Sequence, residues 1–159
     1  MAGSVKDYDP KEIVITWIPV PAPGITPGAI NLGRGIAEGT FVTIARDAQL
    51  NTKRIGGDGE GTRIRSHNRG GTVTVTLRNG SDVHDDISKV LEVYEATGLG
   101  AFGPLSVKDF SGRSLYTSPV AYPQGWPAKS NSAGSEDDLV WVFDCHDLVM
   151  FHGGNAEVS

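Results

Sequence analysis

The sequence predicts a mainly β fold, a sandwich or barrel of about seven strands with one α-helix packed on it. The chain of 159 residues contains 21 glycines and nine prolines, which indicates many turns. Its apolar runs are short and rich in β-branched residues, as is typical of strands. Only one segment has convincing helical spacing. The length suits a single domain, 1–159, whose core needs no disulfide.

Residues 1–30 are expected to form a strand followed by a proline-rich arm. Glu12–Ile18 is apolar on both faces, which predicts a strand. Four prolines between residues 19 and 27 then forbid regular structure, so an extended arm or loop follows. The next strand is predicted at Thr40–Ala45.

Residues 46–71 are polar and contain six glycines. This stretch is longer than an ordinary hairpin loop. It is therefore predicted to be either a functional loop or an extended hairpin whose tip lacks order in the isolated protein.

The clearest strand and the helix come next. In Gly71–Leu77 apolar residues alternate with threonines, so one face is expected to be buried. A helical stripe follows, formed by Val83, Ile87, Val90, Leu91 and Tyr94. Ser81 or Asp82 is expected to cap this helix, and Gly98 to end it.

A hairpin and a long loop are predicted after the helix. Ser106–Phe110 and Arg113–Thr117 flank a Ser-Gly turn signal, and Val120–Tyr122 can extend the second strand. The loop 122–138 is rich in proline, glycine and serine and carries Trp126. This tryptophan either plugs the loop locally or anchors a neighbouring subunit.

The last predicted elements are a central strand and a short C-terminal one. Leu139–Asp144 is apolar on both faces and is expected in the middle of the sheet. Residues 148–152 are a short strand or an ordered part of the C-terminal tail, 148–159. Trp17 and Trp141 lie in apolar strands and are expected in the core.

The net charge of −5 is unevenly distributed. Residues 53–80 carry six basic and two acidic side chains, whereas residues 81–159 carry four basic and twelve acidic ones. Three interpretations of the basic segment stay open: a solvated flexible loop, a patch complementary to an acidic face of another copy, and a nucleic-acid patch. The third is disfavoured because the segment has no aromatic residue to stack on bases.

No motif predicts catalysis, a cofactor or a bound metal. The glycine-rich run 56–61 lacks the lysine of a P-loop. Asp144–Asp147 contains metal-ligand types, and His152 is a further candidate, but neighbours on a strand point to opposite faces. A buried Cys145 with surface neighbours is favoured over a metal site. No apolar run is long enough for a membrane helix, and the N-terminus does not have the pattern of a signal peptide.

Several features occur in a fixed order along residues 30–152. Ala37-Glu38-Gly39 precedes a strand, and a polar stretch leads to the run Gly57-Asp58-Gly59-Glu60-Gly61. The threonine-rich strand, the Ser81-capped helix, the Ser-Gly hairpin and a closing Trp/Phe strand follow. This ordered set resembles the tail tube proteins of long-tailed bacteriophages, in particular the small family of contractile-tailed phages. The proline-rich residues 1–30 and the end of the chain after residue 149 depart from the family pattern.

The resemblance implies a β-barrel-like fold shared with type VI secretion tube proteins. It implies a structural virion protein, assembled in the host cytoplasm, whose hexameric rings stack head to tail into the inner tube of a long contractile tail. The implied partners are other copies of the chain, the tail sheath, and the baseplate and tail-terminator proteins. DNA is expected to pass through the lumen without sequence-specific binding.

The resemblance and the charge pattern together give a set of expected inter-subunit contacts. They are Lys53, Arg54, Asp58, Glu60, Arg63, Arg65, Arg69 and Trp126. Two other functions are kept as alternatives. One is a type VI secretion-like tube protein, whose rings form without phage DNA. The other is a small ligand-binding or metal-binding β-barrel, or an enzyme, built around Asp144–Asp147 and His152.

Overall fold

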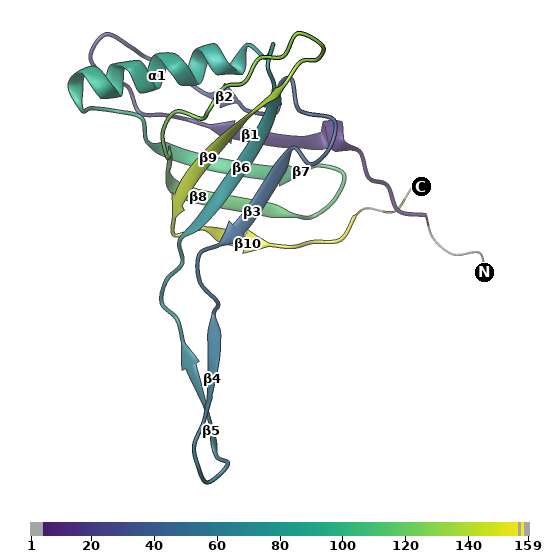
Figure 1. Cartoon of the computed structure of the whole chain (residues 1–159). Coiled ribbons are helices and arrows are strands. Elements are labelled where there is room, and N and C mark those ends of the chain that lie inside the picture. Colours follow the sequence, from purple (N-terminus) through teal and green to yellow (C-terminus); the bar gives the residue numbers. More distant parts are fainter. Residues whose placement is uncertain (1–4, 156, 158–159) are drawn as a thin grey trace.

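The computed structural model describes residues 5–155 and 157, and it confirms the mainly β class with one α-helix (Figure 1). The elements in chain order are a 3₁₀ turn η1 (Pro10–Glu12), β1 (Ile13–Trp17), β2 (Ile30–Asn31), β3 (Val42–Arg46), β4 (Asn51–Ile55), β5 (Gly61–Arg65), β6 (Gly71–Arg78), α1 (Val83–Thr97), β7 (Gly103–Asp109), β8 (Leu115–Pro123), β9 (Asp138–His146) and β10 (Val149–Phe151). The seven predicted strands are all present. The prediction missed β2, and β4 and β5 lie within the segment that was left open between loop and hairpin.

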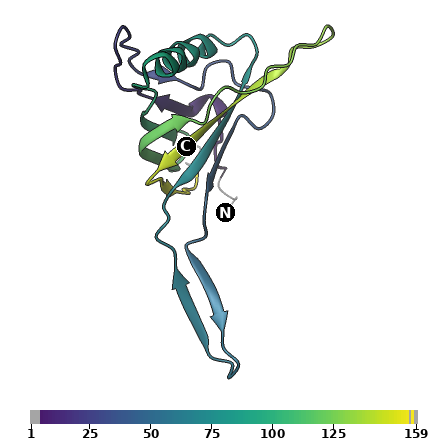
Figure 2. The same ribbon diagram turned by 60° about the vertical axis from the view of Figure 1, so that its left-hand side comes forward.

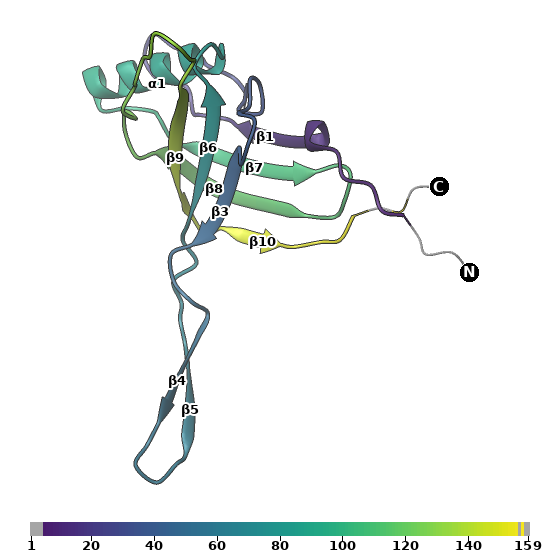
Figure 3. The same ribbon diagram turned by 45° about the vertical axis from the view of Figure 1, so that its right-hand side comes forward.

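Eight strands form one antiparallel sheet with the order β2-β1-β7-β8-β9-β6-β3, and β10 pairs with β8. The predicted central position of β9 is confirmed, because β9 pairs with β6 along eight residues and with β8 along its last four. In Figures 1 and 3 the strands β3, β6 and β9 cross over β1, β7 and β8. The sheet therefore folds over itself. Its ends, β2 and β3, are not paired with each other in the described part of the chain, so closure into a barrel is not confirmed.

The core lies between the two crossing halves of the sheet. Trp17 on β1 meets Phe143 on β9 edge to face, with ring centroids 5.2 Å apart. The indole N–H of Trp17 donates to the carbonyl oxygen of Ala121 at 3.1 Å, which satisfies its polar atom inside the core. The predicted burial of Trp17 and Trp141 and the predicted alternation along β6 are both confirmed.

Helix α1 covers one end of the folded sheet (Figure 2). Its buried residues are Val83, Ile87, Val90 and Leu91, as the stripe predicted. Asp82 occupies the N-cap position, while the hydroxyl of Ser81 accepts the N–H of Val83 at 3.4 Å. Gly98 ends the helix in the left-handed region, with φ +72°. The described part of the chain has no helix with the length and apolar character needed to cross a membrane.

The two ends of the described chain run side by side (Figure 3). Lys6 and Glu157 form an antiparallel bridge. The side chain of Asn155 donates to the carbonyl oxygen of Asp7 at 2.6 Å. The segment before β1 and the C-terminal tail thus contact each other on one side of the molecule.

Candidate functional site

The segment between β3 and β6 forms a long hairpin that projects from the body (Figures 1 and 2). Strands β4 and β5 pair with each other only, and all ten of their residues are exposed. The extended-hairpin alternative is therefore confirmed. Its tip forms a hydrogen-bonded turn, in which the N–H of Gly56 donates to Glu60 O at 2.9 Å and Gly59 adopts φ +88°. The lack of order expected at this tip in the isolated protein stays a prediction.

The register of the hairpin separates its side chains onto two faces. Asn51 lies opposite Arg65, and Lys53 lies opposite Arg63. Because side chains alternate along a strand, these residues share one face, called here the cationic face (Lys53, Arg63, Arg65). The other face, called here the apolar face, is formed by Leu50, Thr52, Arg54, Thr62 and Ile64.

Both faces are left without partners in the isolated chain. Like charges directly opposite each other, as at Lys53 and Arg63, destabilise a strand pair. Over residues 5–155 and 157, none of the four cations of β4 and β5 has an ion-pair partner. On the apolar face, Leu50 is 58% exposed and Ile64 is 49% exposed. A lone two-stranded hairpin of this kind is marginally stable in water, so we expect it to pack against another molecule.

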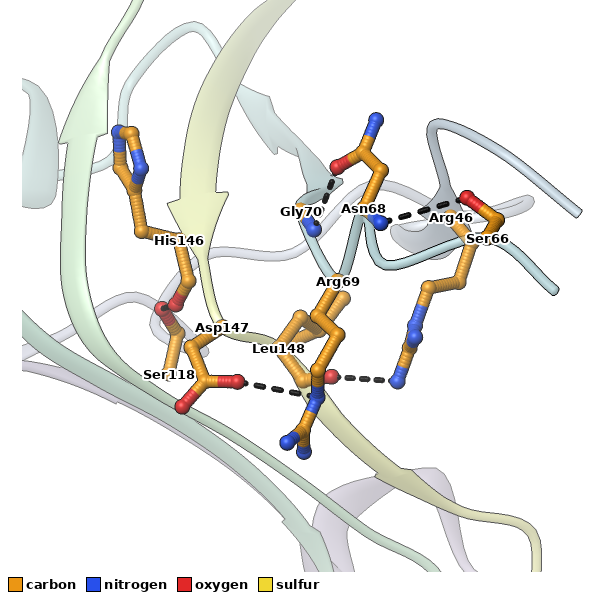
Figure 4. Close-up of polar contacts among 9 residues, drawn as sticks. All are labelled: Arg46, Ser66, Asn68, Arg69, Gly70, Ser118, His146, Asp147 and Leu148. Atoms are coloured by element: carbon orange, nitrogen blue, oxygen red, sulfur yellow. Dashed lines mark hydrogen bonds and ion pairs between the residues drawn. The ribbon is translucent and has the colours of Figure 1, made fainter. Parts of the chain in front are cut away.

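The base of the hairpin is fixed to the turn between β9 and β10 (Figure 4). The guanidinium Nε of Arg69 contacts Asp147 Oδ1 at 3.0 Å. The backbone N–H of Leu148 donates to Arg69 O at 2.8 Å, and Arg46 Nη2 donates to Leu148 O at 2.6 Å. These contacts join residues that are 78 to 102 positions apart in the chain, and they set the direction in which the hairpin leaves the body.

The predicted contact residues occupy three different places. Six of them lie on the strands and tip of the hairpin: Lys53, Arg54, Asp58, Glu60, Arg63 and Arg65. Arg69 lies at the base and is already paired within its own chain. Trp126 lies near α1, where its indole N–H donates to Glu95 and its ring centroid is 6.3 Å from that of Trp141. Trp126 thus packs locally and still exposes about half of its surface.

The end of the molecule opposite the hairpin is acidic. It carries α1 and the start of β9, both far from β4 and β5 in all three ribbon views. The acidic residues on α1 are Asp85, Asp86, Glu92 and Glu95, and those at the start of β9 are Glu136, Asp137 and Asp138. The N–H of Gly80 and the side chain of Arg78 bind Glu136 and lower the pKa of its carboxyl. Opposite net charges therefore lie at opposite ends of the molecule, positive on the hairpin strands and negative at the end that carries α1.

An open apolar groove lies beside the C-terminal half of α1. It encloses about 450 Å³ between this helix, residues 100–102 and the paired ends of β8 and β9. Tyr94 and Phe102 line it and are 46% and 43% exposed. Among the described residues that line it, Asp144 alone is charged, and it accepts a hydrogen bond from Gln124 Nε2 at 2.9 Å. Sequence patterns did not reveal this groove, because its walls come from segments distant in the chain.

The residues around Cys145 do not form a common site. Cys145 is 3% exposed, and burial raises the pKa of its thiol to about 11. His146 is hydrogen-bonded to the hydroxyl of Tyr122 at 2.9 Å, whereas His152 is hydrogen-bonded to Tyr116 at 2.6 Å. Among the residues that the structure describes, no group of three or more His, Cys, Asp or Glu side chains is arranged to hold a metal ion.

Three comparisons with known proteins found a matching family, a similar phage protein and a solved structure with a similar fold. Residues 20–153 match the family described as bacteriophage PhiTE tail tube protein. The chain is 33% identical over 165 residues to "Structural protein ORF10" of Pseudomonas phage KPP10, and the match covers 100% of this chain and 89% of that protein. Among solved structures, the fold is similar to the cryo-EM structure of the anti-feeding prophage cap, a tube-terminating cap. The TM-score is 0.55 at 7% identity, with 98% of this chain and 94% of the other covered, so this likeness concerns the fold alone.

Proposed function

The chain belongs to the bacteriophage PhiTE tail tube protein family, and from this membership we propose that it is the subunit of the DNA-conducting inner tube of a long phage tail. As a phage tail structural protein, its place is in the virion. In the proposal, six copies close into a ring and rings stack head to tail. The tail is of the contractile kind, and the subunits assemble in the host cytoplasm.

The observation that carries the proposal is the polarity of the subunit. A projecting hairpin with unpaired cations lies at one end, and an acidic surface lies at the other. Stacking joins two different faces of the same protein, and such a contact repeats without end. Opposite charges on the two faces favour this orientation and disfavour head-to-head contacts.

The proposed contacts divide by location. Lys53, Arg63 and Arg65 on the cationic face meet carboxylates of the next ring, and Asp58 and Glu60 contribute at the hairpin tip. Arg69 acts indirectly, because its ion pair with Asp147 orients the hairpin. Trp126 adds an exposed aromatic surface at the acidic end.

The proposed partners beyond the chain itself follow from the family. They are the sheath on the outside of the tube, the baseplate at one end and the tail terminator at the other. DNA crosses the lumen and makes no sequence-specific contact. The chain acts structurally and not as an enzyme.

A hairpin truncation tests the proposal. Residues 51–65 are replaced by a two-residue Asn-Gly turn, which leaves Arg46, Arg69 and Asp147 in place. We expect a folded monomer that forms no tubes, measured by size-exclusion chromatography with light scattering and by negative-stain electron microscopy. Normal tubes from the truncated protein would contradict the assigned role of the hairpin.

Charge reversal provides a matched control. The triple variant Lys53→Glu, Arg63→Glu and Arg65→Glu should prevent tube formation. A second triple variant, Lys6→Glu, Lys11→Glu and Lys108→Glu, changes the net charge equally but lies away from the hairpin. It should still form tubes, so a loss in both would point to overall charge and not to the cationic face.

A further inference from the structure

We propose that the apolar face of the hairpin docks into the groove beside α1 of a second copy, and that Arg54 of one copy pairs there with Asp144 of the other. This inference rests on the proposed self-assembly and names the surface that receives the hairpin. It concerns the side of the hairpin turned away from the cationic face.

The first reason is the chemistry of the hairpin face. Leu50 and Ile64 are 58% and 49% exposed in the part of the chain that the structure describes, and Thr52 and Thr62 lie on the same face. Burial of apolar surface stabilises a contact by roughly 25 cal/mol per Å². A face of this composition therefore gains free energy only by packing on another apolar surface.

The second reason is the chemistry of the groove. Its walls are formed by Leu91, Tyr94, Phe102, Val120 and Tyr122. Its volume of about 450 Å³ is in the range of clefts that bind ligands in proteins. Aromatic side chains supply much of the energy at interface centres.

The third reason is charge. Arg54 is the one charged residue of the apolar face, and Asp144 is the one charged residue among the described residues that line the groove. Close charge pairs across an interface are strongly coupled, and they fix its register. A single cation and a single carboxylate, each in apolar surroundings, are complementary.

The occupant must come from another copy. The hairpin projects away from the body (Figure 1), whereas the groove lies on the body, between the C-terminal half of α1 and the paired ends of β8 and β9. Asp144 in this groove lies opposite Thr72, near the base of the hairpin and not along the line of its strands. The contacts of Arg69, Arg46 and Leu148 hold the hairpin in that direction. The hairpin therefore cannot fold back into its own groove while its base stays bonded.

A charge exchange tests the pairing. Arg54→Asp and Asp144→Arg should each raise the protein concentration needed for tube formation by about tenfold. The variant carrying both changes should return close to the wild-type concentration. Lys53→Asp is the matched control, because Lys53 is adjacent in sequence but lies on the cationic face, and Asp144→Arg should not rescue it. Thermal unfolding of each variant establishes that it is folded.

Disulfide cross-linking tests the same contact without a change of charge. A chain carrying Ile64→Cys and Val120→Cys should give a ladder of covalent oligomers on a non-reducing gel. Ile55→Cys with Val120→Cys is the control and should give little cross-linking, because Ile55 lies on the other face. Cys145, the one native cysteine, is buried and does not contribute to the ladder.

The outcomes separate the inference from the function on which it rests. Tubes without rescue by the exchanged pair, and without a ladder from Ile64→Cys, would overturn the groove contact and leave the tube function standing. A Tyr8→Cys and Val120→Cys chain that cross-links efficiently would also overturn it, because the N-terminal segment would then occupy the groove. Wild-type protein that stays monomeric at every concentration would contradict the tube function itself.

Discussion

Leu148 joins the core to the base of the hairpin, and its truncation should weaken the fold strongly. Its side chain is 1% exposed and packs in the core cluster. Replacement of a buried leucine by alanine costs about 3–5 kcal/mol, depending on how far the site relaxes. Here the side chain lies close to the backbone of β6 at Gly71, and the ladder bonds between β6 and β3 hold that backbone in place. We therefore expect Leu148→Ala to lower the free energy of unfolding by about 3 kcal/mol or more.

A substitution at Gly71 tests how closely Leu148 packs against β6. A Cβ at Gly71 would lie 2.5 Å from Leu148 Cδ2 and 2.7 Å from the carbonyl oxygen of Ala45. Gly71→Ala alone should therefore cost about 1–3 kcal/mol through overpacking. In the Leu148→Ala background the first clash disappears and the added methyl group occupies part of the cavity. The double variant should be more stable than the sum of the two losses by about 1 kcal/mol.

The assay is equilibrium unfolding in urea, followed by the fluorescence of the buried Trp17 and Trp141 in dilute protein. Gly39→Ala combined with Leu148→Ala is the control pair, because nothing lies within 4 Å of a Cβ at Gly39. The control losses should add. If the Gly71 and Leu148 losses also added without coupling, or if Gly71→Ala alone cost nothing, the close approach inferred at this site would be refuted.

Three further predictions concern other parts of the molecule. A thiol reagent at pH 8 should modify Cys145 only after unfolding. Because burial raises the pKa of the Cys145 thiol from 9.0 to about 11, the free energy of unfolding should fall as the pH rises through this interval. Cys145→Ala should remove the part of this pH-dependent loss that comes from the thiol. The pKa of Glu136 is lowered chiefly by the N–H of Gly80, so their contact should persist above pH 4.5 and break on further acidification, seen as a shift of the Gly80 amide resonance that Glu136→Gln abolishes. Trp126→Ala should cost about 1–2 kcal/mol in thermal unfolding, because the ring is half exposed and loses one hydrogen bond to Glu95; a larger loss would mean that Trp126 belongs to the core.

Local patterns predicted the elements that bury one face in their own chain. Along β6 the alternation of valine and threonine marks a strand with one buried side, and the stripe on α1 marks a helix on the core. In the run Leu139–Asp144 the face of Leu139, Trp141 and Phe143 is buried, whereas Val140 on the opposite face is 40% exposed. In each case the burial of one face within the chain produces a periodic pattern of apolar residues in the sequence.

Elements that do not bury a face within their own chain could not be predicted from the sequence. Strand β2 has two residues, and its pairing with β1 defines it, so no local pattern marks it. Within the described residues neither face of β4 and β5 is covered, so no alternation of buried and exposed residues reveals their strands. The two faces of this hairpin can be assigned only from the strand register, which places Lys53 opposite Arg63. The pair of Arg69 with Asp147 joins residues far apart in the chain, and no motif marks it.

The position of β9 also has a consequence for the order of events during synthesis. The pairs β3–β6 and β7–β8 consist of segments that are synthesised before β9, the strand that connects β6 to β8. Until residues 138–146 have been made, β6 and β8 each keep an open edge. Pairing across such sequence distances is slow. The nascent chain therefore completes its sheet only after β9 has been made, and the groove whose wall includes β9 is completed with it. Under the docking proposed here, a partly synthesised subunit offers no receiving site to a growing tube.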